Sequence, residues 1–142
     1  MDMLGKEIIH SDVAQVFFDE ENKLMSSVYL PSSANVAEEE FRKHYMKLLD
    51  YIIELHPKYF LLDMRELRFV ISDEMQQWLT EMLVKPIVDR GLEKFAVVTD
   101  NDFFKDLIVR RFLDETKKVK EAEKVPSEFF ESEEEAIKWL LE

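Results

Sequence analysis

The chain has 142 residues, the length of one domain, and its lack of cysteine excludes disulfide frameworks and zinc sites with thiolate ligands. Its 31 acidic residues outnumber 19 Lys and Arg, and the net charge of −12 argues against binding to nucleic acids or anionic membranes. No apolar run approaches the roughly 20 residues that span a bilayer, and the N-terminal stretch has no basic region followed by a hydrophobic segment. These features predict a single cytoplasmic domain over residues 1–142, without membrane insertion.

The first third of the chain predicts a hairpin followed by a helix. Apolar residues alternate in two runs between residues 7 and 30, and residues 20–22 form the turn. The alternating residues are Ala14, Val16 and Phe18 in the first run, and Leu24, Val28 and Leu30 in the second. From residue 36 to residue 55 the apolar period changes to three or four, which predicts an amphipathic helix that Pro57 ends.

The middle of the chain predicts two units of strand and helix. KYFLLDM, residues 58–64, is apolar without alternation, as in a strand covered on both faces. A helix over residues 73–89 follows, with Pro86 kinking its last turn and Gly91 ending the segment. KFAVVTD, residues 94–100, predicts a second buried strand. Four apolar residues mark a third helix: Phe104, Leu107, Ile108 and Phe112.

The last part of the chain predicts an edge strand and a closing helix. Residues 119–130 are interpreted as a loop with a short edge strand near Phe129, because Pro126 has no N–H to give to a central strand. Ser132 and Glu135 form a capping box before a final helix. The whole order predicts an α/β fold, β-β-α-β-α-β-α-β-α, in which a mixed sheet of four to five strands is covered by helices.

Polar residues at the carboxyl ends of the parallel strands mark the expected functional edge, where Asp63 and Asp100 lie. A magnesium site formed by Asp63, Asp100 and Asp102 is one interpretation, but TDND is also an ordinary sequence for a turn and a helix cap. With only two glycines, the chain has no phosphate-binding loop. The sequence therefore predicts no metal and no cofactor.

The three histidines do not predict a catalytic site. His10, His44 and His56 are far apart in the sequence, with no evident nucleophile among their neighbours. Surface or helix-cap roles are the expectation for all three. Because no nucleophile, base and orienting group can be named together, the sequence predicts a protein that is not an enzyme.

Ser72 has two interpretations. As the N-cap of the helix over residues 73–89, its hydroxyl would accept a backbone N–H, and Asp73 and Glu74 would complement the positive end of the helix. A serine exposed at the start of a helix is also accessible to a kinase, and a phosphate there would add a charge of roughly −1.5 to −2.

Three segments resemble the STAS domains, specifically the SpoIIAA-like branch related to anti-sigma-factor antagonists. They are LLDMR at the end of the central strand, RFVIS leading into the second helix, and the closing FFESEEEAIKWL. In phosphorylatable members, an aspartate ends the central strand and a serine that opens the next helix receives phosphate from a kinase. The resemblance carries these roles to Asp63 and Ser72, although the residue before the serine is Ile71 and not an acid.

Two functional hypotheses follow from this resemblance and from the residues. The first is a regulatory module that binds a protein partner, such as a kinase or an anti-sigma-like protein, through an edge formed by Asp63, Arg65, Ser72, Asp73, Asp100 and Asp102. The second is a carrier of a small lipid-like ligand, bound under the second helix by Met75, Trp78, Met82 and Phe104. An apolar cavity of a few hundred Å³ would favour the carrier, and a tightly packed interior would favour the module. Self-association through Trp139 and the hairpin edge is a further expectation.

Overall fold

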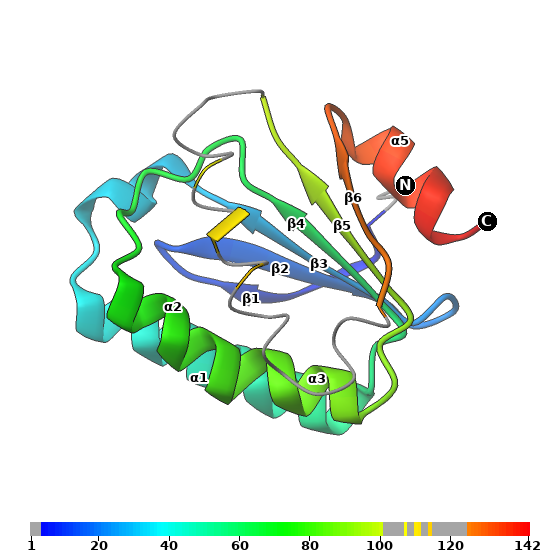
Figure 1. Cartoon of the computed structure of the whole chain (residues 1–142), viewed down its shortest axis with the longest axis horizontal. Coiled ribbons are helices and arrows are strands. Elements are labelled where there is room, and N and C mark those ends of the chain that lie inside the picture. Colours follow the sequence, from blue (N-terminus) through cyan, green and yellow to red (C-terminus); the bar gives the residue numbers. More distant parts are fainter. Residues whose placement is uncertain (1–3, 101–106, 108–109, 112–113, 115–124) are drawn as a thin grey trace.

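The computed structural model describes residues 4–100, 107, 110–111, 114 and 125–142. Within them the chain forms a six-stranded mixed sheet in the order β1-β2-β3-β4-β5-β6 (Figure 1). β1, β2 and β3 pair antiparallel, and β3, β4, β5 and β6 pair parallel. The strands are Lys6–His10 (β1), Ala14–Asp19 (β2), Leu24–Tyr29 (β3), Tyr59–Asp63 (β4), Lys94–Val98 (β5) and Ser127–Phe130 (β6). The α/β class and the antiparallel pair joined to a parallel set are confirmed.

The predicted count of four to five strands is wrong, because the N-terminal hairpin is a meander of three strands. β1 pairs with β2, but the register shifts at a β-bulge between Glu7 and Ile9. A bulge inserts an extra residue and breaks the alternation of faces. The neighbouring residues Ile8 and Ile9 therefore show no period of two in the sequence, and β1 could not be separated from the strand that follows.

The helix α1 spans Glu38–Leu55, close to its predicted bounds. Phe41, Leu48 and Ile52 lie on its buried face, as their spacing predicted. The helix ends at His56, whose backbone is left-handed with φ of 49°, and Pro57 follows. The predicted end of this helix is confirmed.

The second predicted helix is also present, as three consecutive segments. They are α2 (Asp73–Leu79), a π-helical turn η2 (Thr80–Val84) and α3 (Lys85–Asp89). The Lys85 N–H donates to the Thr80 carbonyl, five residues earlier, immediately before Pro86. Because proline has no N–H and crowds the preceding turn, the wider π turn accommodates it inside a continuous helical run.

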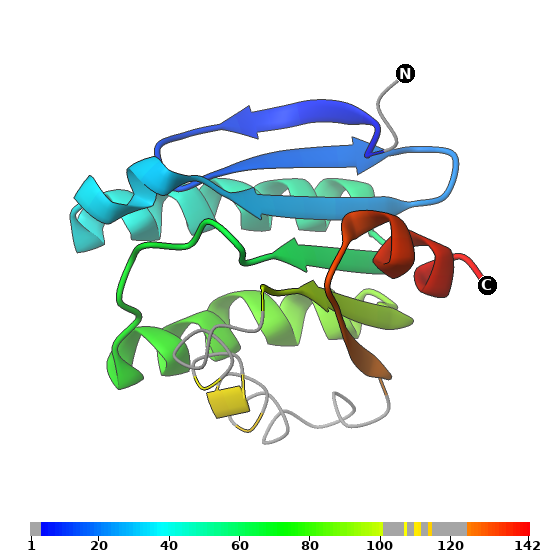
Figure 2. The ribbon, with the colours of Figure 1, turned by 90° about the horizontal axis from the view of Figure 1, so that it is seen from above.

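The helices cover the two faces of the sheet unequally. α1, α2 and α3 lie on one face, and α5 (Glu133–Leu140) lies on the other, over β4, β5 and β6 (Figures 1 and 2). The large core lies between the sheet and the first group of helices. The smaller apolar cluster under α5 consists of Leu24, Leu61, Ala96, Val98, Ala136 and Leu140.

The C-terminal predictions hold where the chain is described. The short edge strand near Phe129 is β6, and Ser132 is the N-cap of α5. Of the third predicted helix, the described residues Leu107, Arg110, Arg111 and Asp114 are helical, and Phe104, Ile108 and Phe112 lie outside the described residues. In the described part of the chain, no helix combines the length and the apolar character needed to cross a membrane.

Candidate functional site

The carboxyl ends of β3, β4 and β5 meet at one edge of the sheet, and four of the predicted site residues divide there between its two faces: Asp63, Arg65, Ser72 and Asp73. Asp63 ends β4 and contacts Arg65 and Glu133 on the side of α5. Ser72 and Asp73 begin α2 on the opposite side. The single partner-binding edge expected from the sequence is therefore two separate groups of side chains.

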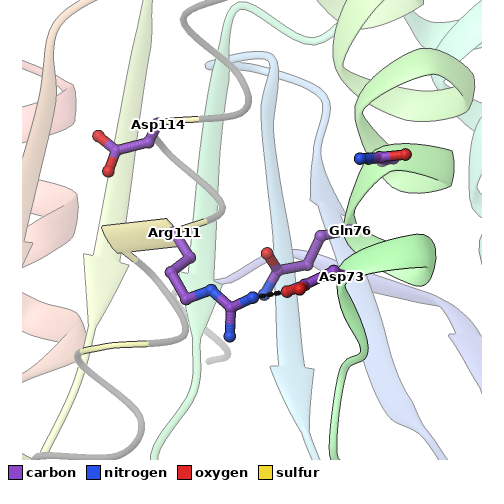
Figure 3. A pocket seen from close by; sticks show the side chains of 5 residues that line it. Asp73, Gln76, Arg111 and Asp114 are labelled. Atoms are coloured by element: carbon purple, nitrogen blue, oxygen red, sulfur yellow. Dashed lines mark ion pairs between the residues drawn. The ribbon is translucent and has the colours of Figure 1, made fainter.

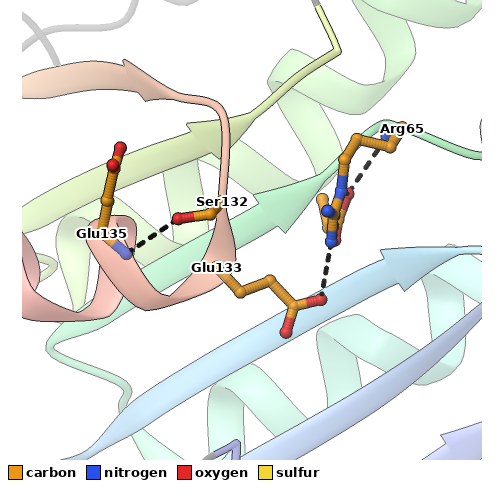
Figure 4. A network of polar contacts seen from close by, with 5 residues as sticks. Arg65, Ser132, Glu133 and Glu135 are labelled. Atoms are coloured by element: carbon orange, nitrogen blue, oxygen red, sulfur yellow. Dashed lines mark hydrogen bonds and ion pairs between the residues drawn. The ribbon is translucent and has the colours of Figure 1, made fainter.

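The first group, which we call the Asp63 cluster, consists of Asp63, Arg65 and Glu133. Arg65 holds both carboxylate oxygens of Asp63, with its Nε 3.0 Å from Oδ1 and its Nη2 2.7 Å from Oδ2. The Arg65 backbone N–H also donates to Oδ1 at 3.1 Å. The same Nη2 lies 3.2 Å from Glu133 Oε1 and so joins the end of β4 to the first turn of α5 (Figure 4).

The Asp63 cluster is a buried charge held by its partners. The Asp63 side chain is only 3% exposed. Burial raises the pKa of Asp63, but the hydrogen bonds with Arg65 and Glu133 and the charge of Arg65 outweigh it, so the net shift is downward. Asp63 is therefore an ionised structural carboxylate at neutral pH, with both oxygens engaged.

The second group lies at the start of α2 and lines a pocket of about 290 Å³. Its residues are Asp73, Gln76, Gln77, Arg111 and Asp114 (Figure 3). Arg111 forms an ion pair with Asp73 across the pocket. Ser72 lies next to the pocket and caps the helix: its Oγ accepts the Met75 N–H at 3.1 Å. The capping interpretation of Ser72 is confirmed.

The loop between β4 and α2 presents one apolar side chain to solvent. Val70 is 83% exposed, whereas its neighbour Ile71 is buried. The preceding Phe69 stacks on Phe41 of α1 with a ring-centroid distance of 4.3 Å. The Arg68 backbone N–H donates to Ser33 Oγ at 2.9 Å. Val70 is thus an exposed apolar residue on a loop that is fixed on both sides.

One histidine, His44, is buried in the core, where the sequence did not predict it. His44 was expected at the surface or at a cap, but it is 4% exposed, and its Nδ1 lies 2.7 Å from Ser11 Oγ. Burial, with a smaller contribution from Lys47, lowers the pKa of His44 to about 4. At neutral pH the buried imidazole is therefore uncharged. The Ser11 hydroxyl also accepts the backbone N–H groups of Val13 and Ala14.

The metal hypothesis finds no support in the residues described. No three His, Asp or Glu side chains of the described ranges come together as a metal site. Asp63 is engaged by Arg65, and Asp100 is exposed after β5. Asp102 lies outside the described residues, so the triad with Asp63 and Asp100 stays untested.

The residues predicted to bind an apolar ligand differ in how deeply they are buried. Met75 is part of the core and 1% exposed. Trp78 is half-buried, with the Arg42 guanidinium 4.8 Å from its ring. Met82 is half-buried, and Phe104 lies outside the described residues. Because the pocket beside α2 is lined by polar side chains, no observation favours the carrier, which stays a prediction.

Comparisons with protein-family models, with curated proteins and with solved structures find no match to this chain.

Proposed function

We propose that this chain is a regulatory protein-interaction module that binds its partner through the loop between β4 and α2. The observation that carries the proposal is Val70, an aliphatic side chain 83% exposed on a loop whose flanking residues are packed. A residue held in this way loses little conformational entropy when a partner covers it. The resemblance to SpoIIAA-like STAS domains supports the same kind of function.

The polar groups around Val70 supply the rim that a protein interface needs. Arg68 and Glu66 form an exposed ion pair on one side, and Ser72 and Asp73 follow on the other. Interfaces typically place an apolar residue at the centre of such a polar rim. A kinase or an anti-sigma-like protein is the partner type that the resemblance implies.

Ser72 is the proposed point of regulation. Its hydroxyl lies on the exposed side of the helix start, two residues after Val70. A phosphate there would lie beside Asp73 and Glu74, which are also negatively charged. The repulsion between these like charges would weaken the packing of the loop onto α2. We propose that phosphorylation of Ser72 alters partner binding through the position of Val70.

The test begins with a photo-crosslinking amino acid in place of Val70, in cells that naturally make the protein. The matched control carries the same amino acid in place of Ile53, which is 44% exposed on α1. We expect a discrete heterologous adduct from position 70 and none from position 53. Equal adducts from both positions would contradict the proposal.

With the captured partner in hand, calorimetry measures the contribution of Val70. We expect Val70→Asp to weaken binding at least tenfold, about 1.4 kcal/mol, and Ile53→Asp to leave it unchanged. Circular dichroism controls for folding. Intact-mass measurement of the protein from its own cells, together with Ser72→Asp and Ser72→Ala, tests the regulatory step.

A further inference from the structure

We infer that the pocket lined by Asp73, Gln76, Gln77, Arg111 and Asp114 binds a neutral amide, such as a primary carboxamide, through the Gln76 side chain. The proposed binding group is Gln76, which is not part of the docking surface around Val70, and only Asp73 is common to the pocket and that surface. The cavity volume of about 290 Å³ lies at the lower end of ligand sites. It suits a small molecule or a single inserted side chain.

The first observation is the environment of Gln76. This residue is 2% exposed, and its Nε2 has no hydrogen-bond partner in the described part of the chain. Leaving a buried donor unpaired opposes folding, and a leucine at this position of α2 would avoid that penalty. A ligand oxygen that accepts a hydrogen bond from Nε2 would satisfy the donor.

The second observation is the charge of the pocket, which selects among oxygen-bearing ligands. Asp73 and Asp114 contribute −2 and Arg111 contributes +1, so the lining has a formal charge of −1. The chain as a whole carries −12, which further opposes an anionic ligand such as a carboxylate. An ammonium group fits this charge but offers no acceptor to Gln76. An amide offers a carbonyl oxygen to Gln76 and carries no net charge.

Access to Gln76 passes the Arg111 side chain. Figure 3 shows the Gln76 side chain directed from α2 toward the Arg111–Asp73 ion pair, and the Asp114 carboxylate lies farther off and points away from this pair. The side chains of Arg111 and Asp73 are 47% and 71% exposed. Ion pairs this exposed contribute little to stability, so Arg111 can move aside when a ligand enters.

The test is a titration of the full-length, ¹⁵N-labelled protein, followed by two-dimensional NMR of its side-chain amides. The chain contains three glutamines, Gln15, Gln76 and Gln77, so these signals are few. Propionamide is the probe, and propionate and propylammonium are controls of similar size. We expect propionamide to shift the Gln76 Nε2 signals saturably. Gln15, whose Nε2 is bonded to Glu7 at 2.9 Å, is the internal reference.

A pair of variants separates binding at Gln76 from general effects. Gln76→Leu should weaken propionamide binding about tenfold, read from the backbone amides of α2, because one buried hydrogen bond is lost. Gln15→Leu is the matched control and should bind as the wild type does. The inference is overturned if the Gln76 signals do not move with propionamide, if propionate binds as well, or if Gln76→Leu binds unchanged.

Two further ligands identify the source of the amide. L-Glutamine represents a free metabolite, and N-acetyl-glutamine N-methylamide represents a side chain of a partner protein. Tighter binding of either one supports the inference and assigns the source, whereas failure of both to displace propionamide overturns it. Val70→Asp should bind propionamide normally, so the outcome is independent of the docking proposal.

Discussion

Two acid–arginine pairs lie at the same edge of the sheet, one on each side, and they differ in burial. The Asp63 side chain is 3% exposed and accepts four hydrogen bonds from Arg65, whereas the Asp73 side chain, paired with Arg111, is 71% exposed. Removing a partner from a buried charge is strongly unfavourable, and removing one from an exposed charge is not. The comparison teaches that burial fixes the ion pair on the α5 side, whereas the exposed ion pair on the α2 side can be broken at little cost in stability.

The largest expected effect comes from Arg65→Met. This change leaves Asp63 buried without its cation and should lower the free energy of unfolding by about 3 kcal/mol, measured by urea denaturation. Asp63→Asn in the same protein removes the charge as well and should recover part of the loss. If Arg65→Met lowers the free energy of unfolding by less than about 1 kcal/mol, Asp63 does not depend on Arg65 as a buried charge should.

The next effect is the contribution of His44 to the pH dependence of the free energy of unfolding, to which Asp63 also contributes. Burial lowers the pKa of His44 to about 4, so the unfolded chain binds a proton at pH values where the folded chain does not. The free energy of unfolding should therefore fall as the pH drops from about 6.5 to about 4, by roughly 3 kcal/mol in total.

The Asp63 contribution has a different pH window. Its pKa is lowered on folding, so its stabilising effect is present at pH values above the unfolded pKa and is lost as the pH falls through the folded one. Urea titrations between pH 7 and 4 should therefore show the His44 effect first. His44→Gln should flatten this part of the curve, and an unchanged slope would contradict the assignment.

A smaller effect compares the two serine caps, one on each side of the sheet. Ser72 Oγ accepts from Met75 N at 3.1 Å and Ser132 Oγ accepts from Glu135 N at 3.2 Å. Ser72→Ala and Ser132→Ala should each lower the free energy of unfolding by about 1 kcal/mol. If the docking proposal holds, only Ser72→Ala should also change partner binding.

The smallest expected effect comes from Arg111→Met. Because its ion pair with Asp73 is exposed, this change should alter the free energy of unfolding by less than about 1 kcal/mol. Urea denaturation beside Arg65→Met measures the contrast between the two pairs directly. Equal losses of unfolding free energy in Arg65→Met and Arg111→Met would contradict the difference between a buried and an exposed ion pair.

Local sequence signals predicted most of the fold. The apolar run KYFLLDM predicted the interior strand β4, and the period of residues 36–55 predicted α1. The capping pattern at Ser132 predicted the start of α5. Each of these signals depends on residues close together in the chain, where period and capping chemistry act directly. The bulge in β1 interrupts the alternation of apolar and polar residues that would have predicted the sixth strand.

The candidate site was less predictable because its contacts join distant residues. The sequence placed Asp63 and Ser72 at the correct strand and helix ends, but not on opposite sides of the sheet. Arg65 and Glu133 are 68 positions apart, and Ser11 and His44 are 33 apart. No pattern in a single sequence marks such a pair. The exposure of Val70 depends likewise on Phe69 reaching Phe41 on another helix.

The bulge in β1 also affects how copies of this protein meet one another. A regular outer strand offers an unbroken row of backbone groups on which another chain can add and start a fibre. The shift between Glu7 and Ile9 interrupts that row, and the exposed charges of Lys6 and Glu7 flank it. The bulge and the two charges therefore disfavour the addition of a further strand at this margin.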